Sequence, residues 1–151
     1  MKVIFLDIDG VLNCEKYIRS CGQSGLIIDP SRMVLLKQII DSTDAKIVLS
    51  TSWREHWDKC ADNCDDTGAQ MNNIFEKFGL KIFDKTPKLC MGRESEIKAW
   101  LEGHGEISCF AVLDDMLLCA DYLDGHFVKT SNHFNGLDET DVKNAIEILN
   151  R

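Results

Sequence analysis

The sequence predicts an α/β fold, a three-layer Rossmann-like arrangement in which helices cover a central, mainly parallel sheet. Short apolar runs alternate along the chain with segments whose apolar residues recur at helical spacing. Continuous apolar runs are typical of strands buried on both faces, and the alternation of strands with helices is typical of parallel sheets. Polar residues follow three of the predicted strands, at the sheet edge where ligands of such folds bind.

The first half of the chain contains two clear strands and one clear helix start. Residues 3–6 form a continuous apolar run that predicts the first buried strand, and residues 46–49 predict the second. The polar segment 14–25 is predicted to be a loop or a small insertion. Asp29 and Pro30 predict the start of a helix, because Asp is a favourable N-cap and Pro is tolerated in the first turn.

The second half continues the same alternation. A helix over 71–78 is predicted to end at Gly79, since Gly favours the position just after a helix C-terminus. The remaining predicted elements are a short strand over 80–83, a helix over 94–101, a strand over 109–113, a short strand over 126–128 and a last helix that begins near residues 138–140.

Length and composition predict one globular domain over residues 1–151. The chain has 17 Lys and Arg against 25 Asp and Glu, a net charge of −8, which argues against a broad footprint for duplex nucleic acid and against anchoring on an anionic membrane. No apolar run approaches the ~20 residues that span a bilayer, and the start does not resemble a signal peptide. We therefore expect a cytoplasmic protein with no membrane association and no obligate protein partner, whose seven cysteines stay reduced.

Carboxylates and hydroxyls follow three of the predicted strands. Asp7, Asp9 and Gly10 come after the first strand, the hydroxyl residues 50–52 after the second, and the two aspartates 114–115 after the strand over 109–113. The carboxyl ends of parallel strands meet at one edge of a sheet, so these groups are expected to lie together. Like charges repel in a partly buried site, and oxygen ligands favour a hard cation such as Mg²⁺.

The spacing within the first motif suits phosphoryl chemistry. If the strand continued, Asp7 and Asp9 would point to the same side, because side chains alternate along a strand. Gly10 would then let the backbone turn away. One carboxylate could attack phosphorus while the other transfers the proton of the leaving oxygen.

Three segments resemble motifs of the haloacid dehalogenase (HAD) superfamily of phosphohydrolases. Residues 5–13 (FLDIDGVLN) resemble the first motif, residues 48–54 (VLSTSWR) the second and residues 112–115 (VLDD) the fourth. The Ser-Trp-Arg of the second segment and the Gly-Leu at 136–137 resemble the branch found within bacterial RNA-repair proteins and as stand-alone chains. The resemblance implies a Mg²⁺-dependent phosphatase with a HAD fold. Residues 13–29 are too few for a full cap domain.

The resemblance also assigns roles to the acidic residues. Asp7 would be the nucleophile that forms an aspartyl-phosphate. Asp9 would be the general acid and then the general base, and its backbone carbonyl would bind Mg²⁺. Asp114 would bind the metal directly, with Asp115 as a further ligand or as a hydrogen-bonding partner of the ligands.

The hydroxyl residues of the second motif are expected to bind phosphate. The resemblance gives this role to Thr51, and Ser50 is the alternative because the end of the strand is not fixed to one residue. The expected substrate-binding residues are Ser50, Ser52, Arg54 and Gly10.

The third motif is where the sequence departs from the family pattern, which usually has a Lys that steadies the nucleophile and the phosphate. Arg93 is the preferred candidate, because it stands at the start of a predicted helix that leads to the strand over 109–113. Helix N-termini favour anions, and Arg can hold phosphate with two hydrogen bonds. Lys88 and Lys98 are the alternatives.

Two weaker patterns surround the second motif. His56, Cys60 and Cys64 recur at a spacing that would stack them on one face of a helix, where they could bind zinc, but two small residues and a histidine on a partly buried helix face are the simpler interpretation. Trp53 and Trp57 could form a stacking wall beside the site, but packing against the core is the simpler interpretation.

The substrate is expected to be a small phosphorylated molecule or a phosphorylated nucleic-acid end. A site without a domain-sized cap and the resemblance to the RNA-repair branch favour the nucleic-acid end. Residues 52–92 are long enough to form a small lid. The alternative functions are a phospho-accepting receiver domain and a catalytically silent binding module. Receivers carry the acidic pair on the first strand and the phosphorylated Asp on the third, the reverse of the order found here.

Overall fold

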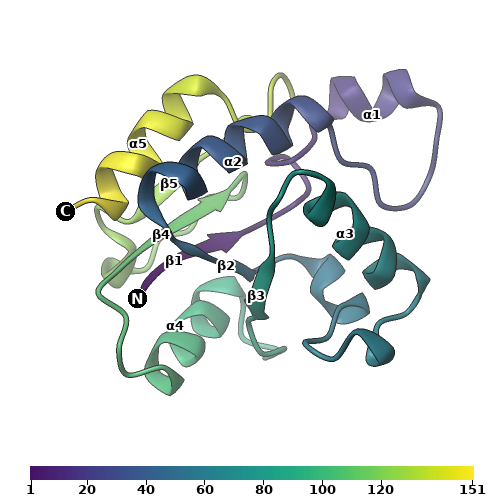
Figure 1. Cartoon of the computed structure of the whole chain (residues 1–151). Coiled ribbons are helices and arrows are strands. Elements are labelled where there is room, and N and C mark those ends of the chain that lie inside the picture. Colours follow the sequence, from purple (N-terminus) through teal and green to yellow (C-terminus); the bar gives the residue numbers. More distant parts are fainter.

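A five-stranded parallel sheet forms the centre of the computed structural model, which describes residues 1–151. The strands lie in the order β3-β2-β1-β4-β5 (Figure 1). Their bounds are Lys2–Leu6 for β1, Lys46–Leu49 for β2, Ile82–Lys85 for β3, Cys109–Asp114 for β4 and Phe127–Lys129 for β5. The α/β class and the parallel sheet that the sequence predicts are confirmed.

Five α-helices and three short 3₁₀ helices connect the strands. The α-helices are α1 (Glu15–Cys21), α2 (Pro30–Thr43), α3 (Asp66–Lys77), α4 (Arg93–Gly103) and α5 (Glu139–Leu149). The 3₁₀ helices are η1 (Ser52–His56), η2 (Ala61–Asn63) and η3 (Asp121–Leu123). None of these helices could span a lipid bilayer.

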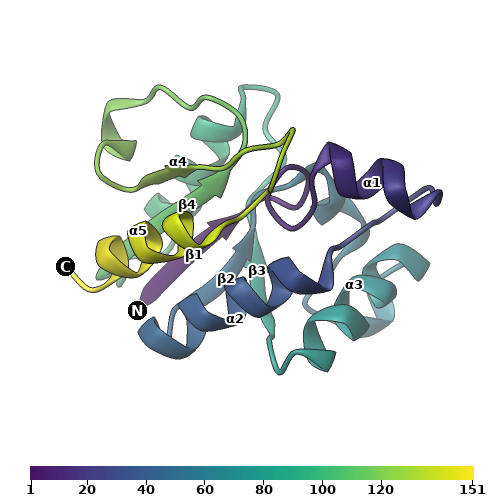
Figure 2. The same ribbon diagram turned by 90° about the horizontal axis from the view of Figure 1, so that it is seen from above.

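Helices cover both faces of the sheet. Helices α2 and α5 lie side by side over one face, and α4 lies over the opposite face (Figures 1 and 2). The strands β1, β2 and β4 are therefore buried on both sides along most of their length, which explains the continuous apolar runs in their sequences. The ends of these central strands stay open to a ligand.

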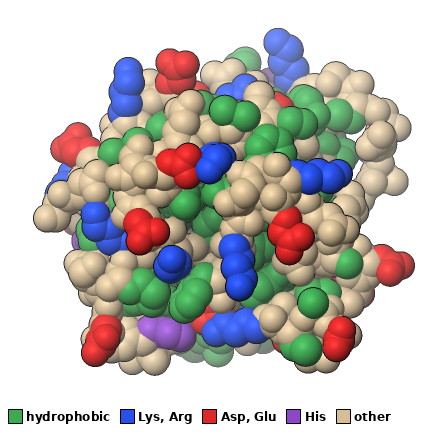
Figure 3. All heavy atoms as spheres, in the orientation of Figure 1, with side chains coloured by type: hydrophobic (Ala, Val, Ile, Leu, Met, Phe, Trp, Pro, Cys, Tyr) green, Lys and Arg blue, Asp and Glu red, His purple; other side chains and the backbone are tan.

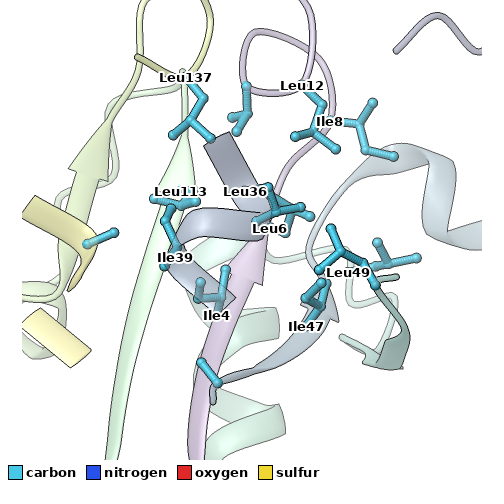
Figure 4. Close-up of a cluster of buried hydrophobic side chains, with 14 of the residues drawn as sticks. Ile4, Leu6, Ile8, Leu12, Leu36, Ile39, Ile47, Leu49, Leu113 and Leu137 are labelled. Carbon is cyan, nitrogen blue, oxygen red and sulfur yellow. The ribbon is translucent and has the colours of Figure 1, made fainter. Parts of the chain in front are cut away.

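The alternation of side chains along β1 divides the core into two clusters. Ile4 and Leu6 pack with Leu36 and Ile39 of α2 in the larger cluster, part of which Figure 4 shows. Val3 and Phe5 instead point to the other face, where the smaller cluster includes Ile97 and Trp100 of α4. A polar residue that continues the Val3–Phe5 row is therefore directed to the α4 side of the sheet.

Side-chain caps fix where α2 and α5 begin. Asp29 accepts a hydrogen bond from the backbone N–H of Ser31 at 2.8 Å, and Pro30 occupies the first turn, as the sequence predicts. Asp138 and Asp141 form a capping box at the start of α5. These caps are why both helix starts can be located from the sequence alone.

Two sequence predictions about the elements are corrected. The segment predicted as a loop, residues 14–25, contains the helix α1. None of its residues is buried, so it has no apolar stripe that would reveal it in the sequence. The helix predicted over 71–78 begins earlier, at Asp66, because the first turn of α3 is polar and is capped by Asp65.

Candidate active site

The topology of the sheet reverses direction beside β1. The chain runs outward from β1 to β2 and β3, and then returns to the other side of β1 to form β4 and β5. In open α/β sheets, ligands bind at such a switch point, outside the carboxyl ends of the strands. The candidate site is therefore the edge where β1 and β4 end.

Three aspartates meet at this edge. Asp7 directly follows β1, and its backbone N–H donates to the carbonyl of Leu113 at 3.0 Å. Asp114 ends β4, and Asp115 follows it. One carboxylate oxygen from each of the three residues lies within 4.8 Å of the others. Asp7 and Asp114 continue the strand rows that face α4, so the sheet register itself brings them together.

Arg93, the first residue of α4, contacts two of these carboxylates. Its Nη1 atom lies 2.5 Å from Oδ2 of Asp7 and 2.5 Å from Oδ2 of Asp114. The two lysines considered for the same position lie elsewhere: Lys88 pairs with Glu55, and the exposed Lys98 lies 4.0 Å from Glu102. Of the three candidates, the structure brings only Arg93 to the carboxylates.

Burial dominates the electrostatics of the site. It raises the pKa of Asp7 above its usual range, an effect that the positive charge of Arg93 reduces and the negative charge of Asp114 increases. Burial likewise raises the pKa of Asp114 and of Asp115. Burial works against the charge of Arg93, but Asp7 and Asp114 raise its pKa overall, so it remains a cation. The site therefore gathers more negative charge than its one arginine neutralises.

The donor set fits a hard divalent cation. Asp7, Asp114 and Asp115 offer only carboxylate oxygens, within a group compact enough to surround one ion. Such an ion would stabilise the charged carboxylates, whose burial and mutual repulsion raise these pKa values. The side chain of Asp9 is not part of this group. The expected binding of Mg²⁺ by the backbone carbonyl of Asp9 stays a prediction.

Asp9 is held by two side chains outside the carboxylate group. Because β1 ends at Leu6, the strand alternation that predicts a shared side for Asp7 and Asp9 does not extend to Asp9. Its carboxylate accepts a hydrogen bond from Nε1 of Trp53 at 2.8 Å and from Nδ2 of Asn13 at 3.1 Å. Asn13 is itself fixed, since its Oδ1 accepts from the backbone N–H of Gly10 at 2.9 Å.

Gly10 lets two strand ends approach each other. Its φ of +75° lies in the left-handed region, and a Cβ at this position would lie 2.5 Å from Cγ of Asp115. Its carbonyl accepts a hydrogen bond from the hydroxyl of Thr130 at 2.6 Å. The structure thus explains Gly10 by packing, and its contact with substrate stays a prediction.

The hydroxyl residues after β2 have different surroundings. Thr51 is fully buried, and its hydroxyl is one of the groups that lower the pKa of Asp7. Ser50 is also buried, with a hydroxyl that has no hydrogen-bond partner. Ser52 is exposed. Thr51 therefore lies beside the nucleophile candidate, and Ser50 stays the alternative for phosphate binding.

The expectation that Arg54 contacts substrate is corrected. Arg54 is only 7% exposed, and its Nη2 lies 2.7 Å from Oε1 of Glu96 on α4. Its Nη1 donates to the carbonyl of Thr51 at 2.7 Å. The guanidinium is thus directed into the protein, because α4 supplies a buried carboxylate that the local sequence does not reveal.

The helical row of His56, Cys60 and Cys64, on which the less favoured zinc interpretation depends, does not form. His56 ends η1, whereas Cys60 and Cys64 flank η2, so the three residues do not share a helix face. His56 instead contacts Asp65, with 2.6 Å between Nδ1 and Oδ2. Of the two tryptophans, Trp57 is buried in the core, as the simpler interpretation predicts.

The structure connects three residues to the site through contacts that the sequence does not predict. Asn13 and Trp53 hold Asp9, although the sequence offers only a stacking wall or core packing for Trp53, and Glu96 pairs with Arg54. Asn13 stands within the first motif, where a turn followed by Asn is a recognisable signal. The partners of Trp53 and Glu96 lie far away in the chain and leave no local signal.

The model of one protein family, described as the HAD domain in Swiss Army Knife RNA repair proteins, matches residues 3–142. No curated protein and no solved structure matches the chain.

Proposed function

The chain belongs to the family of HAD domains in Swiss Army Knife RNA repair proteins, and we propose that it is a Mg²⁺-dependent phosphomonoester hydrolase that acts through an aspartyl-phosphate on Asp7. The family suggests a phosphohydrolase-type activity. The observation that carries the specific proposal is the position of Arg93, whose Nη1 contacts both Asp7 and Asp114. An arginine between two carboxylates at the end of the sheet is arranged to receive a phosphate.

In the first step, an oxygen of Asp7 forms a bond to phosphorus while the bond to the leaving oxygen breaks. Asp9 gives its proton to that oxygen, so the leaving group departs as an alcohol. Arg93 and the hydroxyl of Thr51 bind the phosphoryl oxygens and neutralise the charge that they carry.

In the second step, a water molecule attacks phosphorus and the bond to Asp7 breaks. Asp9, now deprotonated, takes the proton of this water. Inorganic phosphate leaves, and Asp7 and Asp9 return to their starting states. One residue thus serves as acid and then as base.

The carboxylates of Asp7, Asp114 and Asp115 would hold Mg²⁺. When bound, the ion supplies positive charge that reduces the repulsion between the negative phosphate and the negative carboxylate of Asp7. The three residues bring their oxygens within 4.8 Å of one another, and the backbone carbonyl of Asp9 is a further ligand in this proposal.

We propose phosphorylated nucleic-acid ends as the substrate class, in preference to small phosphorylated molecules. The description of the family as a part of RNA repair proteins supports this choice. The net charge of −8 and the interspersed acidic and basic side chains on the face shown in Figure 3 argue against a long nucleic-acid footprint. We therefore expect contact with only a few nucleotides beside the phosphate.

The reaction is tested with p-nitrophenyl phosphate in the presence and absence of Mg²⁺. Multiple turnovers that stop on chelation and return with Mg²⁺ support the proposal, and Asp7→Asn should remove both turnover and the covalent phosphoenzyme. Full activity after exhaustive chelation would contradict it. A receiver-like domain would accept one phosphate from a small acyl phosphate without turnover, and a silent module would do neither.

The substrate class is tested by comparing kcat/KM for 3′- and 5′-phosphorylated oligonucleotides, free mononucleotides and sugar phosphates. Higher values for the oligonucleotide ends are expected. Efficient hydrolysis of one small metabolite together with no hydrolysis of oligonucleotide ends would contradict the choice of substrate while leaving the chemistry intact.

A further inference from the structure

The indole of Trp53 connects the segment after β2 to the carboxylate of Asp9. Its Nε1 lies 2.8 Å from Oδ2 of Asp9, which is an exposed residue. An exposed carboxylate without such partners rotates freely between rotamers. Trp53 and Asn13 together engage both of its oxygens, since Asn13 donates to Oδ1 at 3.1 Å.

The position of Trp53 is itself fixed by its neighbours. Its backbone N–H donates to the hydroxyl oxygen of Thr51, the N-cap of η1, at 3.4 Å. The next residue, Arg54, is buried, donates to the carbonyl of Thr51 and pairs with Glu96 of α4. The indole thus extends toward Asp9 from a segment that is tied to the rest of the site.

The hydrogen-bonding chemistry is compatible with proton transfer. An indole N–H is a donor only, and each carboxylate oxygen accepts about two hydrogen bonds. One acceptor position on each oxygen of Asp9 therefore stays open beside the bonds from Trp53 and Asn13. The proton that Asp9 must give and later take can occupy such a position without displacing either partner.

We propose that Trp53 is a positioning residue, whose indole N–H orients the carboxylate of Asp9 for the transfer of a proton to and from the reacting oxygens. This inference rests on the proposed phosphatase function. Trp53 exchanges no proton itself. Its loss leaves Asp7, Arg93 and the metal ligands unchanged and affects only the steps in which Asp9 transfers a proton.

The chain provides a matched control in Trp57, four positions later. Its Nε1 donates to Oδ1 of Asn72 at 2.8 Å, and its side chain is packed in the core. Trp53→Phe and Trp57→Phe therefore remove the same N–H group from the same segment, but only the first removes a contact with Asp9.

The test compares two substrates that differ in their need for a general acid. p-Nitrophenolate leaves without protonation, whereas the oxygen of an alkyl phosphate such as glycerol phosphate must be protonated as it departs. Since general acid catalysis contributes roughly 10²–10⁴-fold, we expect Trp53→Phe to lower kcat/KM for glycerol phosphate by about tenfold or more and to change kcat/KM for p-nitrophenyl phosphate less than about twofold. With p-nitrophenyl phosphate, the phosphoenzyme of Trp53→Phe should accumulate, because its formation is nearly unchanged while its hydrolysis needs Asp9.

Several results would overturn the proposal. These are an equal loss on both substrates, an equal selective loss in Trp57→Phe, unchanged kinetics in Trp53→Phe, or faster hydrolysis of glycerol phosphate by that variant. If the wild-type protein hydrolysed neither ester and formed no phosphoenzyme, the proposed function would fail, and this inference with it. An active wild type with an unaffected Trp53→Phe variant would overturn the inference alone.

A measurement on the free protein tests the contact without any turnover. The indole N–H resonance of Trp53 should shift in Asp9→Ala, while the resonance of Trp57 should not. An unshifted Trp53 resonance would show that the contact does not exist in solution and would also overturn the proposal.

Discussion

Arg54 and Glu96 form a buried ion pair, with 2.7 Å between Nη2 and Oε1 and less than a tenth of either side chain exposed. The pair connects η1 to α4, the helix that begins with Arg93. Oε1 of Glu96 also accepts a hydrogen bond from the backbone N–H of Leu89 at 3.0 Å. One carboxylate thus joins the second motif, α4 and the loop before α4.

Removal of one partner of this pair should destabilise the protein. Arg54→Met leaves the charge of Glu96 buried and unpaired, so we expect the free energy of unfolding to fall by about 3 kcal/mol in a denaturant titration. Lys88→Met is the matched control, because it breaks the exposed pair with Glu55, which solvent screens, and should cost far less. Equal decreases in the free energy of unfolding of the two variants would show that the buried pair contributes no more to stability than the exposed pair.

Arg93 should be replaceable by Lys but not by an uncharged residue. A single nitrogen of Arg93 contacts both Asp7 and Asp114, so one ammonium group in the same place could retain both contacts. We expect Arg93→Met to lower kcat by about 100-fold or more. Arg93→Lys should keep most of the activity that Arg93→Met loses. Lys98→Met is the control and should leave the kinetics unchanged. Equal activities of the Met and Lys variants would contradict the proposed charge effect.

Substitution of the two aspartates of the first motif should affect different steps of the reaction. Asp7→Asn removes the nucleophile, so no phosphoenzyme should form. Asp9→Asn keeps the backbone carbonyl and the carboxylate group of the other three aspartates, so Mg²⁺ should still bind, while both chemical steps slow by roughly 10²-fold or more. Titration of the metal and rapid-quench trapping of phosphate separate the two cases. Phosphate trapped on Asp9 would reverse the roles.

Tyr122 should make the stability fall at high pH. Burial raises its pKa to about 12, and its hydroxyl donates to the carbonyl of Glu94 at 2.6 Å. The folded state therefore holds the proton more tightly than the unfolded state does, so this contribution is complete below pH ~10 and is lost as the pH rises toward 12.

Since Tyr122 is partly exposed, solvent screening limits the loss to about 1 kcal/mol. Denaturant titrations between pH 9 and about 12 should show this slope in the wild type and a weaker one in Tyr122→Phe. Burial and the neighbouring Cys21 also raise the pKa of the other tyrosine, Tyr17, but it is less buried than Tyr122, so Tyr17→Phe should remove a smaller part of the slope. A slope that survives in Tyr122→Phe would assign it to other groups.

The elements that the sequence predicts well are those whose signals are local. Residues 3–6 and 109–113, and residues 47–49 within the predicted strand 46–49, are continuous apolar runs because helices cover both faces of their strands. The starts of α2 and α5 are visible because Asp29 and Asp138 cap them. The helix α1 buries none of its residues, so no periodic pattern marks it.

The site is predictable only as far as strand ends define it. Asp7, Asp114 and Asp115 meet because the sheet register requires it, and the sequence indicates this. The partners of Arg54 and of Asp9 depend on how η1 packs against α4 and against the turn after β1. No periodicity records such contacts, and this is why the sequence predicts substrate binding for Arg54 and core packing or a stacking wall for Trp53.

The sheet order has a consequence for the newly made chain. Strand β1 is synthesised first but stands between β2 and β4, and its Lys2 pairs with Cys109. Until β4 has left the ribosome, one edge of an apolar strand lacks its neighbour, and unpaired apolar edges promote aggregation. The strand that closes this edge also delivers Asp114 beside Asp7. A nascent chain therefore covers this edge of β1 and assembles its acidic centre in the same folding event.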